Sequence, residues 1–321
     1  YNKIRKKQKG GILMNIKITK NIKEANCITH AGTFHADEIF ATLILSKIKE
    51  ELVVIRLNEF REEEKNILKN QDYIVYDIGG GQFDHHQQGG NGQRENGVKY
   101  AACGLIWKEF GKNLLQKYGV KEVEYTLNYI DKNLIQFIDA NDNGQLTKID
   151  AEYRNVHISY IVSLFNPKWN EQIDSDIKFM KALEISEKIF NEFLNDTISK
   201  IEAKDKVEIA IEKAKDQIMI LDEFMPWKEF LLTSQNKKAK DINYVVFPSS
   251  RGGYNVYAVP KELGSFENRK SLPEKWRGLR DEELKKQTGV KTARFCHNAG
   301  FICSADTKDG ALELAYIANV E

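Results

Sequence analysis

A short segment with two adjacent histidines constrains this chain more than any other part of its sequence. The segment Phe83-Asp84-His85-His86-Gln87 follows closely on an apolar run, residues 73–76, that ends in Asp77. Four of the six histidines fall into two windows, residues 30–35 and 85–86, and acidic residues stand beside them in both. Imidazole and carboxylate groups in one place are typical of metal ligands, whereas packing does not call for them. The pattern therefore predicts a metal site.

The first part of the chain alternates between short β-rich runs and helical runs, up to about Gly144. The expected strands cover residues 26–29, 52–57 and 73–76, and the expected helices cover residues 38–48, 59–68, 101–110 and 123–140. This order is typical of a parallel α/β sheet. Ligands of such sheets bind at the carboxyl ends of the strands, which is where the acids and histidines lie.

The first window places His30 and His35 between an expected strand and the helix that begins near Glu38. His35 and Asp37 alternate around Ala36, so an extended or turning backbone directs both side chains at one centre. Helix capping is the competing interpretation of Asp37. It accounts for neither histidine.

The second window joins Asp77 to His85 and His86 through three glycines, residues 79–81, which allow a sharp turn. The third window lies at the end of a helix, where Asp139 and Asp142 are three residues apart and share one face. Two acids at a helix C-terminus oppose its dipole, a cost that a metal ion would offset. A solvated Asp-Asn-Gly turn is the alternative, and Asp139 competes with Asp142 for the ligand role.

Beyond Gly144 the pattern predicts long amphipathic helices and then a second, smaller α/β lobe. No glycine or proline occurs between Pro167 and Pro226, and apolar residues recur at helical spacing. We expect an α/β protein of two lobes: a catalytic domain at residues 14–165, a helical connector at 166–215 and a substrate-binding domain at 216–321. Residues 1–13 are interpreted as a non-native or disordered extension before Met14. Dimerisation through the connector stays open.

Composition narrows the possible partners and compartment. The net charge is +1 and no stretch of the 321 residues is long and apolar enough to span a membrane. Four scattered cysteines without a paired motif indicate a reducing, cytoplasmic setting. Because the net charge is close to zero, a nucleic-acid partner would need a local basic patch. Residues 261–294 supply one, with ten Lys or Arg against six acids, and Arg269, Arg277 and Arg280 are suited to forked phosphate contacts. A charged, solvated helix at residues 273–286 is the alternative; we favour it for residues 281–286, and substrate contact for residues 276–280.

The windows HADE, YDIGGGQFDHHQ and FIDANDNG resemble those of the DHH phosphoesterase superfamily, and more narrowly the melanocyte-proliferating-gene (MYG) exonuclease family. The similarity runs from about Met14 to Val320 and includes LDEFMPWKEFL, FENRKSLPEKWRGLRDEEL and FCHNAGF. It implies two manganese-like ions, with magnesium as the alternative: one held by His30, His35 and Asp77, the other by Asp37, Asp77, His85 and Asp142. Many members have an acid where this chain has His35.

The resemblance also implies roles for residues around the ions and in the second lobe. Asp77, Asp84, His85 and His86 would be catalytic, with His86 touching the substrate phosphate and Asp84 orienting a histidine. His297-Asn298-Ala299-Gly300-Phe301 resembles a nucleotide-contacting turn, so we expect His297, Gly300 and Lys308 to bind substrate beside the three arginines. The implied activity is a 3′–5′ exonuclease on RNA or short oligonucleotides. The alternatives are a small-molecule phosphohydrolase and a non-catalytic nucleic-acid-binding protein.

Overall fold

The computed structural model describes residues 15–68, 73–146, 152–153 and 155–321. The chain divides into two compact units, one up to Ile198 and the other from Ser199. The division falls inside a single helix of 39 residues, α8 (Ser175–Lys213), where we expected several connecting helices. The interpretation of residues 1–13 lies outside the described residues. The assignment of a catalytic and a substrate-binding domain stays a prediction.

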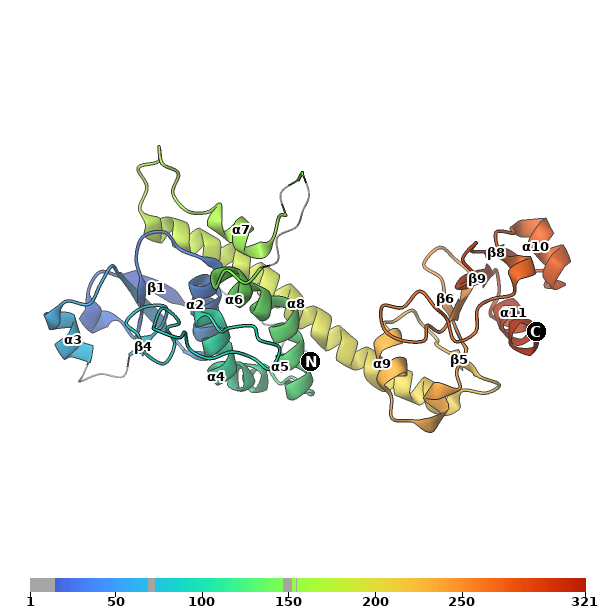
Figure 1. The fold of residues 1–321 in the computed structure, drawn as a ribbon. Coiled ribbons are helices and arrows are strands. Elements are labelled where there is room, and N and C mark those ends of the chain that lie inside the picture. Colours follow the sequence, from blue (N-terminus) through green and yellow to red (C-terminus); the bar gives the residue numbers. More distant parts are fainter. Residues whose placement is uncertain (1–14, 69–72, 147–151, 154) are drawn as a thin grey trace. The chain divides into compact units, whose positions relative to one another are not determined.

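The first unit contains a parallel sheet of four strands in the order β1-β3-β2-β4. Figure 1 labels β1 and β4, the two edge strands of this sheet. The strands are β1 (Ile16–Thr19), β2 (Cys27–His30), β3 (Leu52–Leu57) and β4 (Ile74–Val75). The parallel sheet is thus confirmed. The short edge strand β1 was not expected, because four residues give too little alternation to separate a strand from a loop.

The register of this sheet brings two predicted site residues together. The chain passes from β2 to β3 on one side and then crosses to β4 on the other side of β2. Ile28 is paired with Val75, and His30 and Asp77 each lie two residues further along. Both therefore reach the carboxyl edge side by side, at the point where the direction of the connections reverses. Open α/β sheets bind their ligands at such points.

Helix α2 (Ala36–Ile48) is the central helix of the first unit. Every residue from Ala36 to Leu45 is buried, and the helix packs against α4, α6 and α7. A helix that is enclosed on all faces carries its first turn into the interior. The other helices are α3 (Glu62–Leu68), α4 (Ala102–Lys117), α5 (Val123–Ile130), α6 (Gln136–Asp142) and α7 (Ile158–Ser163).

The helix expected over residues 123–140 is interrupted. A π-helical turn, Asp131–Ile135, separates α5 from α6. Such turns are rare and often lie at functional sites. Here the turn precedes the helix that carries Asp139 and Asp142.

The second unit contains a mixed sheet in the order β5-β6-β7-β9-β8. Only β5 and β6 run parallel. The elements are β5 (Ile218–Ile220), α9 (Lys228–Thr233), β6 (Tyr244–Pro248), β7 (Tyr254–Ala258), α10 (Asp281–Thr288), β8 (Ala293–Cys296), β9 (Ile302–Ala305) and α11 (Lys308–Val320). One face packs a core around Trp276, Val256 and Leu314.

The helix expected at residues 281–286 is confirmed as part of α10, but it does not extend back to residue 273. Gly278 has a φ of 82°, which a continuing right-handed helix cannot accommodate. The segment instead forms a 3-10 helix, Glu274–Trp276, and the separate helix α10.

Within the described residues, no helix combines the length and apolar character needed to cross a membrane.

Candidate metal centre

The turn between β2 and α2 presents four side chains that can bind a metal. His30 ends β2, His35 precedes the first turn of α2, and Asp37 and Glu38 lie in that turn. Both acids are fully buried. The backbone N–H of His35 donates to Glu38 Oε2 at 2.8 Å, which closes the turn. The positive end of the helix dipole favours carboxylates here, but only by a modest amount.

Asp77 follows β4 with a φ of 58°, in the left-handed region that residues with a Cβ seldom adopt. This conformation directs its carboxylate at three imidazoles, those of His30, His85 and His86. Oδ2 lies 3.1 Å from His30 Nε2, and Oδ1 lies 3.4 Å from His85 Nδ1. A strained backbone at a cluster of ligand-type groups is common at functional sites.

Asp84 organises the loop that carries the paired histidines. Its carboxylate accepts hydrogen bonds from the backbone N–H groups of Gly80 at 2.6 Å and His86 at 3.0 Å, and it lies 2.9 Å from His86 Nδ1. Burial alone would raise the pKa of Asp84, but these hydrogen bonds outweigh it and lower the pKa. The structure therefore places Asp84 where it can orient His86.

His85 lies between two carboxylates from different elements. Its Nε2 is 2.7 Å from Oδ2 of Asp142, the last residue of α6, and its Nδ1 faces Asp77. Burial opposes the charged imidazole, but the two acids raise the pKa of His85 overall. The pKa of His30 rises to about 11, because Asp77 and Glu38 overcome the effect of burial in the same way. The His35 side chain is more exposed, and its Nδ1 lies 3.7 Å from Asp142 Oδ1.

The buried carboxylates are the test of whether these residues fit a metal ion. Both oxygens of Asp37 are buried and neither accepts a hydrogen bond from an N–H or hydroxyl group; the carboxylates of other acids lie close to them. One oxygen each of Asp37, Glu38 and Asp77 lies within 4.8 Å of the others, and His35, Asp37 and Asp142 form a second such group. Buried, unpaired carboxylates are costly unless a cation is present. The residues fit a divalent ion, and their mixture of oxygen and imidazole donors suits manganese or a similar transition metal.

Asp139, the alternative to Asp142, faces another partner set. It accepts a hydrogen bond from the Gly104 backbone N–H at 2.9 Å, and its Oδ2 is 2.8 Å from Arg94 NH2. Arg94 also donates to both oxygens of Asp131, at 2.9 and 2.7 Å. This network ties α6 and the π-helical turn to α4. The structure therefore brings Asp142, and not Asp139, to the histidines.

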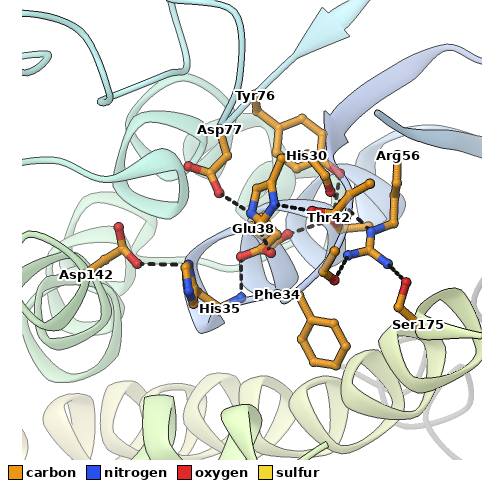
Figure 2. Close-up of polar contacts among 12 residues, drawn as sticks. His30, Phe34, His35, Glu38, Thr42, Arg56, Tyr76, Asp77, Asp142 and Ser175 are labelled. Atoms are coloured by element: carbon orange, nitrogen blue, oxygen red, sulfur yellow. Dashed lines mark hydrogen bonds and ion pairs between the residues drawn. The ribbon is translucent and has the colours of Figure 1, made fainter. Parts of the chain in front are cut away.

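A buried arginine supports the turn that carries His30 and His35 (Figure 2). Arg56 on β3 donates to the carbonyl oxygens of His30 at 3.3 Å and Gly32 at 2.9 Å, and to Ser175 Oγ at 3.3 Å. It also donates to Asp176 Oδ1 at 2.9 Å. Its guanidinium carbon lies 4.4 Å from the centre of the Phe179 ring. The turn is thus joined to the first residues of α8 by a rigid, forked side chain.

Three residues of this centre were missed by the sequence analysis: Glu38, Arg56 and Arg94. The signal for Glu38 was its place three residues after His35, the spacing of a capping pair. The signal for Arg56 was a charge inside an otherwise apolar strand. We find no sequence signal for Arg94.

Apart from His86, the residues expected to bind substrate lie in the second unit, where they fall into separate places. Arg277 packs against Gly300, where an added Cβ would come within 2.5 Å of Arg277 Nε, and the Gly300 N–H donates to the His297 carbonyl at 2.9 Å. Arg280 stacks on Phe295. The remaining two are engaged elsewhere: Arg269 NH1 donates to the carbonyls of Ala239, Lys240 and Ile242, and Lys308 lies 3.4 Å from Asp222. Their roles stay predictions.

Almost the whole chain is similar in sequence to known proteins. Residues 26–318 match the MYG1_exonuc model, described as an uncharacterised protein family (UPF0160). The MYG1 protein YER156C of Saccharomyces cerevisiae is 32% identical over 333 residues, covering 95% of this chain and 97% of its own. The MYG1 protein of Dictyostelium discoideum is 34% identical, covering 89% and 94%. The human protein named MYG1 exonuclease is 32% identical, covering 89% and 84%. No solved structure matches the chain.

Replacing Gly104 with alanine should displace Asp139 and weaken the whole centre. The new Cβ would lie 1.8 Å from Asp139 Oδ2. Overpacking of this kind costs about 1–3 kcal/mol of unfolding free energy. Chemical denaturation of Gly104→Ala should show that loss, whereas Gly81→Ala, where an added Cβ meets nothing within 4 Å, should not. Equal stability of the two variants would contradict the proposed network.

Arg56→Lys should weaken metal binding without removing the buried positive charge. Lysine cannot form the forked contacts to the two carbonyls, so the turn would hold His30 and His35 less firmly. We expect the affinity for Mn²⁺ to fall by about 10-fold or more, a typical effect of residues that orient ligands. Titration of Mn²⁺ followed by electron paramagnetic resonance measures this, with exposed Arg61→Lys as the control. Unchanged affinity in Arg56→Lys would rule out this supporting role.

The metal-free protein should lose stability as the pH rises above about 4. Burial, together with the neighbouring acids Asp77 and Glu38, raises the pKa of Asp37 well above its usual value. The unfolded chain ionises near pH 4, so the stabilising contribution is complete below that pH and is lost as the pH rises through the folded-state pKa. Asp37→Asn should therefore melt at a higher temperature than wild type at pH 7, and the difference should vanish near pH 4. If the melting temperatures of Asp37→Asn and wild type differ by the same amount at every pH, the ionised carboxylate of Asp37 has a stabilising partner and the prediction is wrong.

Proposed function

The chain belongs to the MYG1_exonuc family, and we propose that it is a divalent-metal-dependent phosphodiesterase with a DHH-type centre. The proposed reaction is 3′–5′ exonucleolytic cleavage of RNA or short oligonucleotides. The human relative is named an exonuclease, which supports a nucleic-acid substrate. The direction of cleavage and the choice of RNA come from the family resemblance of the sequence motifs.

One observation carries the proposal: Asp37 is fully buried with both carboxylate oxygens unpartnered, among Glu38, Asp77 and Asp142. A protein that only binds nucleic acid does not require acids inside its interior, and these would repel a phosphate. When bound, divalent ions supply Lewis-acid chemistry: they lower the pKa of water and offset negative charge on the phosphate. Manganese is proposed because imidazole nitrogens stand beside the carboxylates.

The side chains around the centre can position a phosphodiester. The His86 ring is 57% exposed, and the contact of Nδ1 with Asp84 fixes its orientation. We assign to its outer nitrogen a hydrogen bond to a phosphate oxygen. The hydrogen bonds that Asp84 accepts lower its pKa, so its carboxylate keeps its negative charge beside His86.

For the second unit we propose contacts with the terminal nucleotide through Arg277, His297 and Gly300. Arg277 Nε and NH2 both donate to the Leu272 carbonyl at 3.1 Å, and its side chain is 29% exposed. The His297 and Phe301 rings lie 4.5 Å apart, with His297 exposed. A guanidinium beside aromatic rings suits a phosphate and an adjoining base. Arg269 NH1 already donates to three backbone carbonyls, so fewer of its N–H groups are available to a phosphate than in Arg277.

Asp77→Asn should abolish Mn²⁺-dependent cleavage of end-labelled short RNA. Asparagine keeps the shape but removes the charge between His30 and His85, so we expect the rate to fall by at least about 100-fold. Glu109→Gln, an exposed change on α4, should cleave as wild type does. Denaturing gels would show single-nucleotide shortening from the 3′ end.

Other outcomes of this experiment would point to different functions. Cleavage of dinucleotides or pyrophosphate, but not of longer RNA, would replace the exonuclease with a small-molecule phosphohydrolase. RNA binding with no cleavage of any phosphoester would replace it with a binding protein. Equal rates for Asp77→Asn and wild type would contradict the proposed centre.

A further inference from the structure

Glu38 has a buried carboxylate whose two oxygens face different groups (Figure 2). Oε2 accepts the hydrogen bond from the His35 backbone N–H. Oε1 lies 2.8 Å from His30 Nε2 and has no hydrogen bond of good geometry. The side chain is completely inaccessible to solvent. Helix capping accounts for Oε2 but not for Oε1, which faces the His30 imidazole.

The negative charge of Glu38 is not explained by capping either. A glutamine at this position would accept the same hydrogen bond without placing a charge in the interior. Asp37, also fully buried, stands beside Glu38 with both oxygens unpartnered, and Asp77 completes the group. Among the ion pairs of the described residues, none joins these three acids to a lysine or arginine. His30 is paired with Glu38 and Asp77, His85 and His86 reach only Asp77 of the three, and none of these ion pairs is formed by Asp37.

Charge and geometry together indicate what faces Oε1. His30, His35 and Glu38 each offer one ligand atom, and these atoms lie within 4.8 Å of one another. His35 also reaches Asp37 and Asp142, and its side chain is 55% exposed, so it is the least firmly held of the three. Glu38 is fixed by its cap, by the enclosed helix α2 and by burial. A fixed carboxylate in contact with a fixed imidazole is a well-organised pair of metal ligands.

We propose that Glu38 is a direct ligand of the metal ion on the His30 side of the centre, together with His30 and Asp77. This assignment rests on the metal dependence proposed above, and it adds a ligand that the sequence motifs did not identify. Glu38 supplies a buried carboxylate in a fixed position, which the more exposed His35 does not. His35 is then free to serve the side of the centre that contains Asp142.

The test compares wild type with Glu38→Gln, which keeps a capping oxygen and removes the charge. Two quantities are measured: the affinity for Mn²⁺, by electron paramagnetic resonance of the free ion, and the melting temperature with and without Mn²⁺. Without metal, Glu38→Gln should melt at a higher temperature than wild type, because repulsion from Asp37 and Asp77 is relieved. Its Mn²⁺ affinity should fall by at least about 10-fold, and Mn²⁺ should raise its melting temperature less.

Two results would overturn the assignment, and they differ in what else they overturn. If Glu38→Gln binds Mn²⁺ as tightly as wild type, Glu38 is only a cap, while the proposed function stands. If wild type binds no Mn²⁺, the metal-dependent function fails together with this assignment. Should Glu38→Gln fail to fold, Glu38→Asp retains the charge but withdraws it by one methylene group. That variant should also bind Mn²⁺ more weakly, and unchanged binding would again overturn the assignment.

Discussion

The burial of uncompensated negative charge at the start of α2 is the constraint on which the first unit depends. An apolar helix enclosed on every face holds Asp37 and Glu38 inside the protein, and the parallel sheet adds Asp77 at its carboxyl edge. The helix dipole and the imidazole of His30 offset only part of this charge. In the absence of a cation, such a cluster would be expected to cost several kcal/mol. A divalent ion resolves the conflict, and the fold can then be understood as a scaffold that keeps ligands in place before the ion arrives.

Two buried arginines prevent the scaffold from relaxing away from the charge. Arg56 donates hydrogen bonds to the backbone of the turn between β2 and α2. Arg94 fixes α6 through its contacts with Asp131 and Asp139. Neither arginine has a contact with the central acids in the described structure, so each stabilises the position of the ligands without neutralising them. The left-handed backbone of Asp77 also indicates that the ligands are held in position, because a strained residue persists only where its surroundings fix it. The centre is therefore preorganised by interactions outside it.

Much of this arrangement could be predicted from the sequence, because local patterns determine it. The strand at residues 52–57 has the expected bounds, and alternating strands and helices predict that His30 and Asp77 meet at one edge of a sheet. What could not be predicted depends on partners distant in the sequence. Asp139 and Asp142 are equivalent until Arg94 and Gly104 are placed beside one of them. In the same way, Gly278 ends a helix that the charge pattern alone would continue, and Glu38 looks like an ordinary capping residue until its burial is known.

The most direct test is diffraction from crystals soaked in Mn²⁺, recorded at the manganese absorption edge. The account predicts anomalous density in contact with the carboxylates of Asp37, Glu38 and Asp77, with the positions of Arg56 and Arg94 unchanged from the metal-free crystal. Fully ordered side chains without any anomalous density, with Asp37 and Asp77 in protonated hydrogen-bonded contact, would show that the cluster is stable without a cation. That result would contradict the central claim.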